Sequence, residues 1–310
     1  MSATAMLEAA PEARTRPPAL DVPTVVLALS IVLLGLIMVT SASITIAGRD
    51  GDPFAYLERQ VVLVLLGFAA AAASFALPTR RLEQAAVPLL WVAIALLLAL
   101  FVPGLGHLVN GSRRWLRIAG LNFQASEAAR VLTLIYLASY AVRYEDALRS
   151  GFGGLARPLG LLAVIALLLL LEPDFGAASV LFLTGFGVLF LAGARLRWVL
   201  TMLLAAGGSM ALLVLFSGYR MRRLTAFLDP WADPYHSGFQ LTQSLIAIGR
   251  GAWFGVGLGA SVQKLFYLPE AHTDFLFAVL AEELGLVGVA LTLALFLALA
   301  WRALLIARRA

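Results

Sequence analysis

The feature that most constrains this chain is a series of about eight apolar stretches, each long enough to cross a lipid bilayer. A transmembrane helix needs roughly 20 mostly apolar residues. The stretches cover about residues 23–46, 58–77, 84–103, 125–142, 157–172, 175–193, 197–217 and 275–301. In lipid, backbone polar groups must be paired within the protein, so such stretches form helices. We therefore expect an all-α polytopic membrane protein with about eight transmembrane helices.

Composition agrees with this class and excludes several kinds of site. Of 310 residues, 61% are hydrophobic and 13% are charged, whereas soluble domains are about half apolar and a quarter charged. The chain has no cysteine, which excludes disulfides, thiolate metal sites and cysteine nucleophiles. A net charge of +5 in a membrane protein reflects loops and lipid headgroups rather than nucleic acid.

The ends and loops suggest a domain layout and an orientation. Residues 1–22 lack apolar periodicity and predict a disordered cytoplasmic tail. Residues 23–310 predict a single transmembrane domain, with an extracytoplasmic loop over 218–274. A cytoplasmic N-terminus places many arginines of the tails and short loops inside, as the positive-inside rule favours.

Two basic clusters then fall outside, against that rule. One follows the third stretch and the other lies within 218–274; an anionic ligand on the outer face would explain both. Their members are Arg113, Arg114, Arg117, Arg220, Arg222, Arg223, Arg250 and Lys264, the single lysine of the chain.

The first cluster, in NGSRRWLRIAGLNFQASEAARVL at 110–132, has two interpretations. Asn110–Gly111 predicts a turn, and Ser126 could cap the next helix, where Glu127 and Arg130 lie one turn apart. The structural interpretation is this ion pair beside a solvated arginine loop. The functional interpretation is that Arg113 or Arg114 binds phosphate, because a guanidinium donates bidentately.

The second cluster lies in the segment from 219 to 265. Arg220 and Arg223 would share a helix face, Pro230 and Pro234 predict a turn, and residues 239–248 are amphipathic. A nucleotide-binding loop would need a strand and a helix around the glycines that follow, and neither is present. Close backbone packing or a re-entrant turn fits better. The glycines are Gly249, Gly251, Gly255, Gly257 and Gly259.

Titratable residues gather in LPEAHTDFLFAVLAEELG, residues 268–285. Taken alone, Asp274 or Thr273 would be a helix cap. Glu282 and Glu283 lie inside the apolar run, where an acid costs several kcal/mol unless it faces a cavity or pairs with another span. The residues alone indicate an anionic, lipid-linked or phosphorylated ligand that meets external arginines near a carboxylate.

Several motifs carry a family resemblance over about residues 34–310. They are SAS (41–43), NGSRRWL (110–116), NFQASEAAR (122–130), EPDFGAA (172–178), YRMRRLTAFLDPW (219–231), GFQLTQSLIAIGRGAWFGVGLG (238–259) and QKLFYLPEAHTDFLFAVLAEELGLVG (263–288). In this order they resemble the SEDS proteins (shape, elongation, division and sporulation), the FtsW/RodA/SpoVE family of peptidoglycan polymerases. The forms at 219–223 and 263–275 look more like the division branch than the elongation branch.

The resemblance implies glycosyl transfer from lipid II, a disaccharide-peptide on undecaprenyl pyrophosphate, at the outer face of the bacterial cytoplasmic membrane. The family's essential acid falls on Asp274, expected to act as general base. Substrate-binding residues would be Arg113, Arg114, Arg220, Arg223, Lys264 and His272. Supporting residues would be Glu127, Arg130, Glu270 and Glu283.

The resemblance also implies partners. These are a class B penicillin-binding protein transpeptidase, other division proteins and membrane lipid, and they predict a location at the septum. No protein metal site is expected, although a divalent cation, Mg²⁺ or Mn²⁺, could accompany the pyrophosphate.

The chain departs from the family pattern in two places. Ala125 and Arg130 stand where the family usually has proline and lysine, and a permanent guanidinium at 130 excludes proton transfer there. Family members usually have ten spans, so we expect a C-terminally truncated chain.

Two other functions fit the same residues. A flippase for lipid II would also use buried charges and a polar cavity, but alternating access favours midplane sites and repeated halves, and no internal repeat is visible. A non-catalytic scaffold that activates a partner transpeptidase is the other, and it can coexist with catalysis.

Overall fold

A computed structural model describes residues 20–49, 51–109, 112–118, 121–265 and 267–309. The predicted tail therefore lies outside the described residues, apart from its last three positions. The chain forms two compact units, one made of Met1–Ala70 with Arg222–Ala310 and the other of Ala71–Met221. The single domain expected over 23–310 stays a prediction.

All eight predicted spans fold as helices. They are α1 (Val22–Arg49), α2 (Ala55–Ala76), α3 (Thr79–Ala99), α4 (Ala125–Arg143), α6 (Phe152–Leu171), α7 (Phe175–Leu191), α8 (Leu196–Leu215) and α11 (Leu276–Ala307). Within the described ranges six are long and apolar enough to cross a membrane; the other two are α4, which carries three charged residues, and α7, which has 17 residues. The helical, polytopic membrane class is thereby confirmed.

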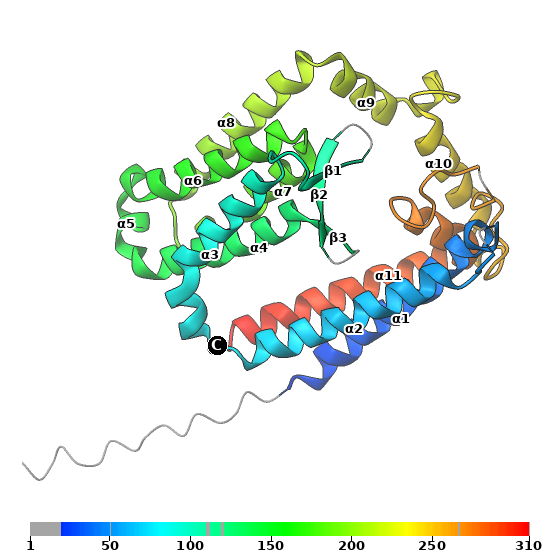
Figure 1. Ribbon diagram of the computed structural model, residues 1–310, viewed down its shortest axis with the longest axis horizontal. Helices are drawn as coiled ribbons and strands as arrows, with labels where there is room; N and C mark the ends of the chain where they lie inside the picture. Colours follow the sequence, from blue (N-terminus) through cyan, green and yellow to red (C-terminus); the bar gives the residue numbers. More distant parts are fainter. Residues whose placement is uncertain (1–19, 50, 110–111, 119–120, 266, 310) are drawn as a thin grey trace, which may run out of the picture. The chain divides into compact units, whose positions relative to one another are not determined.

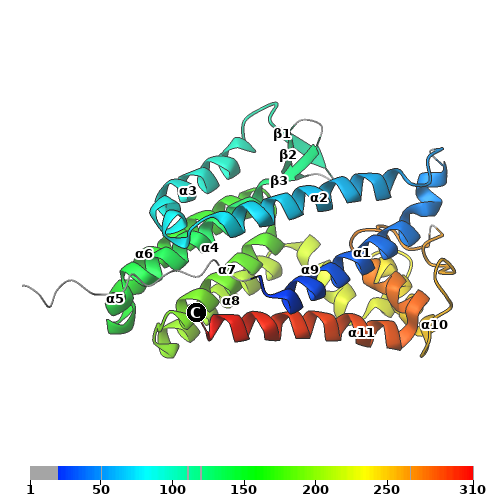
Figure 2. The ribbon, with the colours of Figure 1, turned by 90° about the horizontal axis from the view of Figure 1, so that it is seen from below.

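In the first unit, α1 and α11 lie side by side along their length (Figures 1 and 2). One stripe of α1, with Met38 and Ala42, is buried against Ala278 and Val279. A second stripe, at Leu29, Leu33 and Ile37, is exposed. Apolar side chains exposed at this spacing on an apolar helix are suited to face lipid.

The segment between α8 and α11 contains two further helices, α9 (Gly218–Leu228) and α10 (Phe239–Gly251), and the short 3₁₀ turn η2 (Pro230–Ala232). The amphipathic run at 239–248 lies within α10. Helix α10 packs against the start of α11 with Ala247 and Gly251 buried. A methyl group on Gly251 would lie 1.9 Å from the carbonyl oxygen of Ala281, so the glycine permits this close approach.

Helix α11 is broken at Gly285, whose φ of 66° and ψ of −166° are not helical. The chain at 252–257 runs beside the break and forms hydrogen bonds with the backbone groups that the break leaves without helical partners. The Val256 and Gly257 amides donate to the carbonyls of Glu282 and Glu283 at 2.9 and 3.1 Å. Non-helical backbone at membrane depth is tolerated where protein satisfies it. The predicted close backbone packing holds at Gly251 and Gly255, whereas an added methyl group at Gly249, Gly257 or Gly259 would have no described atom within 4 Å.

In the second unit, α3, α4, α6, α7 and α8 form a helical bundle, with the short α5 (Glu145–Ser150) before α6. Helices α6 and α7 form a tight hairpin whose turn is at 172–174. A methyl group on Gly185 would lie 3.0 Å from the Leu162 side chain, so this glycine brings the two helices together. Between α3 and α4 the chain forms a small antiparallel sheet that the sequence did not predict.

The sheet is a meander of β1 (Gly106–Val109), β2 (Ser112–Ile118) and β3 (Leu121–Gln124) in the order β1-β2-β3. Trp115 pairs with His107 on one side and Gln124 on the other. The predicted turn residues at 110 and 111 lie outside the described residues. The sheet holds Arg113 and Arg114 on its central strand.

Candidate functional site

Asp274 is exposed, two residues before α11 begins. Its predicted role as a helix cap is wrong: the N-cap residue of α11 is Phe275, and among the described residues no side chain caps this helix. The reason is a turn at Glu270, whose φ is 54°. The Glu270 carbonyl accepts the amides of Thr273 and Phe275, both at 3.2 Å. Within the described ranges Asp274 accepts no hydrogen bond, so its carboxylate is available.

The rest of the Asp274 segment is anchored to the protein. Leu268 and Ala271 are buried in the core of the first unit. The ring of His272 contacts that of Tyr56 edge-on at 4.9 Å, and its Nδ1 is buried without a hydrogen-bond acceptor or donor among the described residues. Glu270 accepts from the Thr273 hydroxyl at 2.9 Å. Asp274 therefore lies in a segment whose other residues, 268 and 270–273, contact the rest of the protein or one another.

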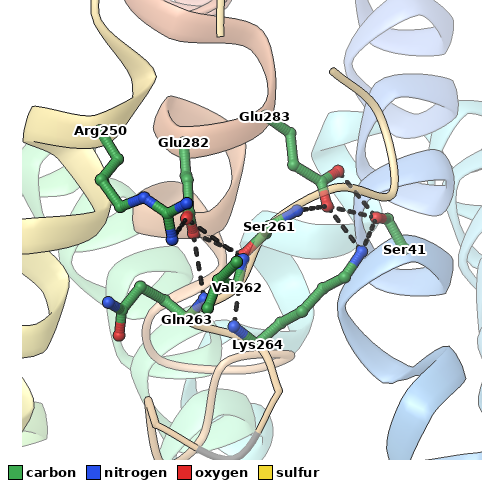
Figure 3. A network of polar contacts seen from close by, with 8 residues as sticks. All are labelled: Ser41, Arg250, Ser261, Val262, Gln263, Lys264, Glu282 and Glu283. Carbon is green, nitrogen blue, oxygen red and sulfur yellow. Dashed lines mark hydrogen bonds and ion pairs between the residues drawn. The ribbon is translucent and has the colours of Figure 1, made fainter. Parts of the chain in front are cut away.

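Glu283 and Lys264 form a buried ion pair (Figure 3). The Lys264 Nζ lies 2.7 Å from the Glu283 Oε1, and the side chains are 2% and 0% exposed. The Ser41 hydroxyl from α1 is 2.8 and 2.7 Å from the two Glu283 oxygens and 2.9 Å from Nζ. Three segments distant in the chain meet here, and the pairing of Glu283 with another element agrees with one prediction for it.

Glu282 makes a second set of contacts on the same side of the break (Figure 3). One carboxylate oxygen accepts from the Ser261 hydroxyl at 2.5 Å and the Gln263 amide at 3.3 Å, and the other accepts from the Val262 amide at 3.2 Å. Arg250 of α10 adds an ion pair at 3.2 Å. Glu282 and Glu283 together hold residues 261–264 against α11, and their charges are balanced by Arg250 and Lys264.

In the second unit, Arg114 of β2 binds the turn between α6 and α7. Its guanidinium donates to the carbonyls of Glu172, at 3.4 Å, and Pro173, and lies 3.9 Å from the Asp174 carboxylate. Asp174 caps α7 by accepting the Ala177 amide at 3.1 Å. Arg114, a third exposed, thus fastens the sheet to the helical hairpin.

Glu172 in this turn is 3% exposed, and neither carboxylate oxygen has a hydrogen-bond donor among the described residues. Burial, helped by the negative charge of Asp174 and opposed by Arg114, raises the pKa of Glu172 from its ordinary 4.5 to about 8. Glu172 therefore holds a proton at neutral pH.

The predicted cap at Ser126 is wrong. Strand β3 runs directly into α4, whose N-cap residue is Gln124 and has no side-chain cap bond. Ser126 falls instead in the first helical turn and lies 3.4 Å from the Asp174 carboxylate. The expected ion pair between Glu127 and Arg130, three residues apart, is present.

The remaining cationic candidates lie on β2 and α9. Arg113 belongs to β2, and its side chain is outside the described part. Arg220 and Arg223 are three residues apart in α9, as predicted. The Arg220 guanidinium stacks over the Phe175 ring at 5.5 Å and donates to the Leu213 carbonyl at 3.1 Å. Arg223 is exposed.

Comparison with known families decides the class of this chain. The model of the FtsW/RodA/SpoVE family, described as cell cycle proteins, matches residues 22–310. The chain belongs to this family. The match begins at the first residue of α1 and covers all of the second unit and most of the first.

Curated members of the FtsW/RodA/SpoVE family are closely similar. A probable peptidoglycan glycosyltransferase FtsW of Thioalkalivibrio sulfidiphilus is 54% identical over 293 residues, which cover 94% of this chain and 73% of the relative. The FtsW of Coxiella burnetii, with the same description, is 49% identical over 92% of this chain and 77% of the relative. These relatives confirm the predicted enzyme class, a peptidoglycan glycosyltransferase, at the level of the family.

Solved structures of the FtsW/RodA/SpoVE fold agree with the architecture. A chain of a peptidoglycan synthase complex, described as coordinating polymerization and crosslinking, matches with a TM-score of 0.70 and 31% identity over 92% of this chain and 77% of the other. The rod shape determining protein RodA of Thermus thermophilus matches with a TM-score of 0.58 and 31% identity over 92% and 74%. This family member is therefore a multi-pass membrane protein.

The sequence did not predict several residues of two polar networks. One surrounds Glu282 and Glu283, and the other joins Arg114 to the turn at Glu172 and Asp174. Ser41 belongs to the SAS motif at 41–43, but nothing along the chain connects it to Glu283. Glu172 and Asp174 belong to the EPDFGAA motif, and two acids between apolar runs are a signal of the kind that singled out Glu282 and Glu283. The functional roles assigned to the candidate site residues stay predictions.

Proposed function

We propose that this chain polymerises lipid II into glycan strands on the outer face of the cytoplasmic membrane, with Asp274 as general base. The observation that carries the proposal is the state of the acids around α11. Glu282 and Glu283 are buried and paired with cations, whereas Asp274 is exposed and, among the described residues, accepts no hydrogen bond. Of these acids, Asp274 is the one suited to take a proton from a substrate.

The reaction needs one base and an anion-stabilising surface. The 4-hydroxyl of one sugar attacks the anomeric carbon of the other, the bond from that carbon to the pyrophosphate oxygen breaks, and the hydroxyl proton passes to Asp274. The polyprenyl pyrophosphate leaves with the bonding electrons and needs no proton at neutral pH. One displacement inverts the anomeric carbon, so a single carboxylate suffices where inverting hydrolases use two.

Arginines are the proposed ligands of the departing pyrophosphate, because fixed guanidinium groups stabilise developing negative charge. Arg113, Arg114, Arg220 and Arg223 are the candidates. The charge of Lys264 is already balanced by Glu283, so a direct role for it in phosphate binding requires that pair to separate. His272, partly exposed beside Asp274, is a further proposed substrate contact.

A divalent cation beside the pyrophosphate stays a proposal. Within the described part of the chain, no three or more His, Cys, Asp or Glu residues gather as a metal site. A cation would have to be held largely by the substrate's own phosphates, and the proposed steps do not depend on it.

We also propose a class B penicillin-binding protein transpeptidase as partner, together with other division proteins and membrane lipid. The support is the similarity to a chain of a solved synthase complex that joins polymerization with crosslinking. The high identity to FtsW proteins supports septal wall synthesis, and the arginine distribution supports a cytoplasmic N-terminus.

The test is polymerisation of lipid II by the purified protein with a partner transpeptidase whose own active site is inactivated. We expect Asp274→Asn to abolish glycan chains on a gel, while Asp229→Asn, at an exposed acid of the same long segment, leaves them unchanged. Glycan formation at the parent rate by Asp274→Asn, with folding and partner binding intact, would falsify the base assignment. Lipid II movement across vesicles without any glycan formation would instead favour a flippase.

A further inference from the structure

Next to the break in α11 lies an ion pair so deeply buried that its contribution to the stability of the fold does not account for it. Lys264 and Glu283 are 2% and 0% exposed. Removing two charges from water costs as much as their attraction returns, and well-packed apolar residues usually serve a fold equally well. Such a pair has a clearer use where it selects one backbone conformation over others.

The ion pair joins the loop that precedes Asp274 to the helix that follows it. Lys264 lies ten residues before Asp274 and Glu283 nine residues after it. Ser41 adds a contact from α1 to both, and Glu282 binds the Ser261 hydroxyl and two backbone amides of the same loop. The segment that presents Asp274 is therefore clamped at both ends to one point of α11.

The clamp coincides with the break in the helix. The carbonyls of Glu282 and Glu283 accept amides from 256 and 257 rather than completing the helix, and Gly285 allows the non-helical turn. Because the carboxylates project from a point where α11 changes direction, their contacts fix both the loop and the start of the helix.

We propose that Lys264 and Glu283, bridged by Ser41, are positioning residues that hold Asp274 in the place where it meets the acceptor hydroxyl. This inference rests on the proposed function. The two residues act through the backbone of 265–282 and do not touch the substrate. Misplacing a catalytic group by about 1 Å can cost about 100-fold in rate, so the clamp controls turnover rather than affinity.

The test uses the complete protein with its partner and lipid II. Lys264→Met leaves Glu283 buried without a cation, and we expect loss of both stability and turnover. The double variant Lys264→Met/Glu283→Gln removes both charges. We expect its thermal midpoint to return close to the parent, its turnover at saturating lipid II to stay about 10- to 100-fold lower, and its KM to change less than about twofold.

A milder variant keeps the test informative if the double variant folds poorly. Ser41→Ala removes the bridging hydroxyl and leaves the ion pair in place, and we expect turnover to fall about 3- to 10-fold with KM unchanged and a smaller loss of thermal midpoint than in Lys264→Met. Ser30→Ala is its match on the same helix, because the Ser30 hydroxyl donates to the Val26 carbonyl of that helix and to no other described residue. Ser30→Ala should have parent activity.

A second ion pair made by α11 is the control for the double variant. Arg302 of α11 donates to Asp21, just before α1, at 3.3 Å, at the opposite end of α11 from Asp274. We expect Asp21→Asn/Arg302→Met to leave turnover unchanged.

Two results would overturn the inference: parent turnover in a folded Lys264→Met/Glu283→Gln, or an increase in KM with turnover retained, which would make Lys264 a substrate ligand. Failure of the proposed function looks different, because Asp274→Asn itself would then polymerise lipid II at the parent rate.

Discussion

Gly251 of α10 and Ala281 of α11 meet through their backbones, with space for no side chain between them. A methyl group on Gly251 would lie 1.9 Å from the Ala281 carbonyl oxygen. This contact brings α10 to the residue that precedes Glu282, and so places Arg250 within 3.2 Å of that carboxylate. A helix contact and a buried charge network thus depend on the same glycine.

The first prediction follows from this contact. Gly251→Ala must push α10 away from α11, and we expect it to destabilise the protein by about 1–3 kcal/mol or more and to weaken the Glu282 network. Gly249→Ala, two residues earlier in α10, is the control, because no described atom outside the helix backbone lies within 4 Å of an added methyl group there. Thermal unfolding in detergent measures both. Equal midpoints for the two variants would contradict the packing described.

The second prediction concerns the buried acid of the α6–α7 turn. The pKa of Glu172 is raised to about 8 in the folded protein and is near 4.5 when unfolded. Between these values folding takes up a proton, so rising pH lowers stability, by up to about 1.4 kcal/mol per pH unit. Below about pH 4.5 both states are protonated and the cost disappears.

Glu172→Gln removes this dependence while keeping the shape of the side chain. We expect its thermal midpoint to exceed that of the parent by a margin that widens from pH 5 to pH 8 and then levels. Asp229→Asn, at an exposed acid, should follow the parent at every pH. A margin for Glu172→Gln that stays constant across this range would show that Glu172 ionises normally.

The positions of the helices could be predicted from the sequence, whereas the contacts among buried polar side chains could not. Apolar runs such as 157–172 and 275–301 report local structure, and they mark the helices because a bilayer leaves the backbone few alternatives. The pairing of Lys264 with Glu283, and of both with Ser41, depends on how distant segments pack. Sequence indicated only that an acid at 283 needed a cavity or another span to pair with.

The errors also have local physical causes. Asp274 has the residue type and spacing of a cap, but a left-handed turn at Glu270 diverts the backbone that it would have capped. Ser126 fails as a cap because β3 continues into α4 without a loop. The sheet itself was missed because SRRWLRI at 112–118 is rich in arginine and lacks a clear alternation of apolar and polar residues.

The last prediction links Arg114 to Glu172. The guanidinium lowers the pKa of Glu172 against burial and Asp174, and it also fastens β2 to the turn through two backbone carbonyls. Arg114→Met removes both effects. We expect a loss of about 1.5–3 kcal/mol, the usual value of hydrogen bonds to a charged group, and a Glu172 titration that moves to higher pH.

The matched control is Arg117→Met, on the same strand, where the arginine is exposed and pairs through its backbone with Asn122. Thermal midpoints of both variants, measured from pH 5 to pH 9, separate the two effects, because lost hydrogen bonds lower stability at every pH whereas a moved titration changes only where the curve bends. If the Arg114→Met curve bends at the same pH as the parent, Arg114 acts on the turn as a fastening alone. If Arg117→Met reproduces the shift, the effect is one of general surface charge, and the specific contact between β2 and the α6–α7 turn does not control Glu172.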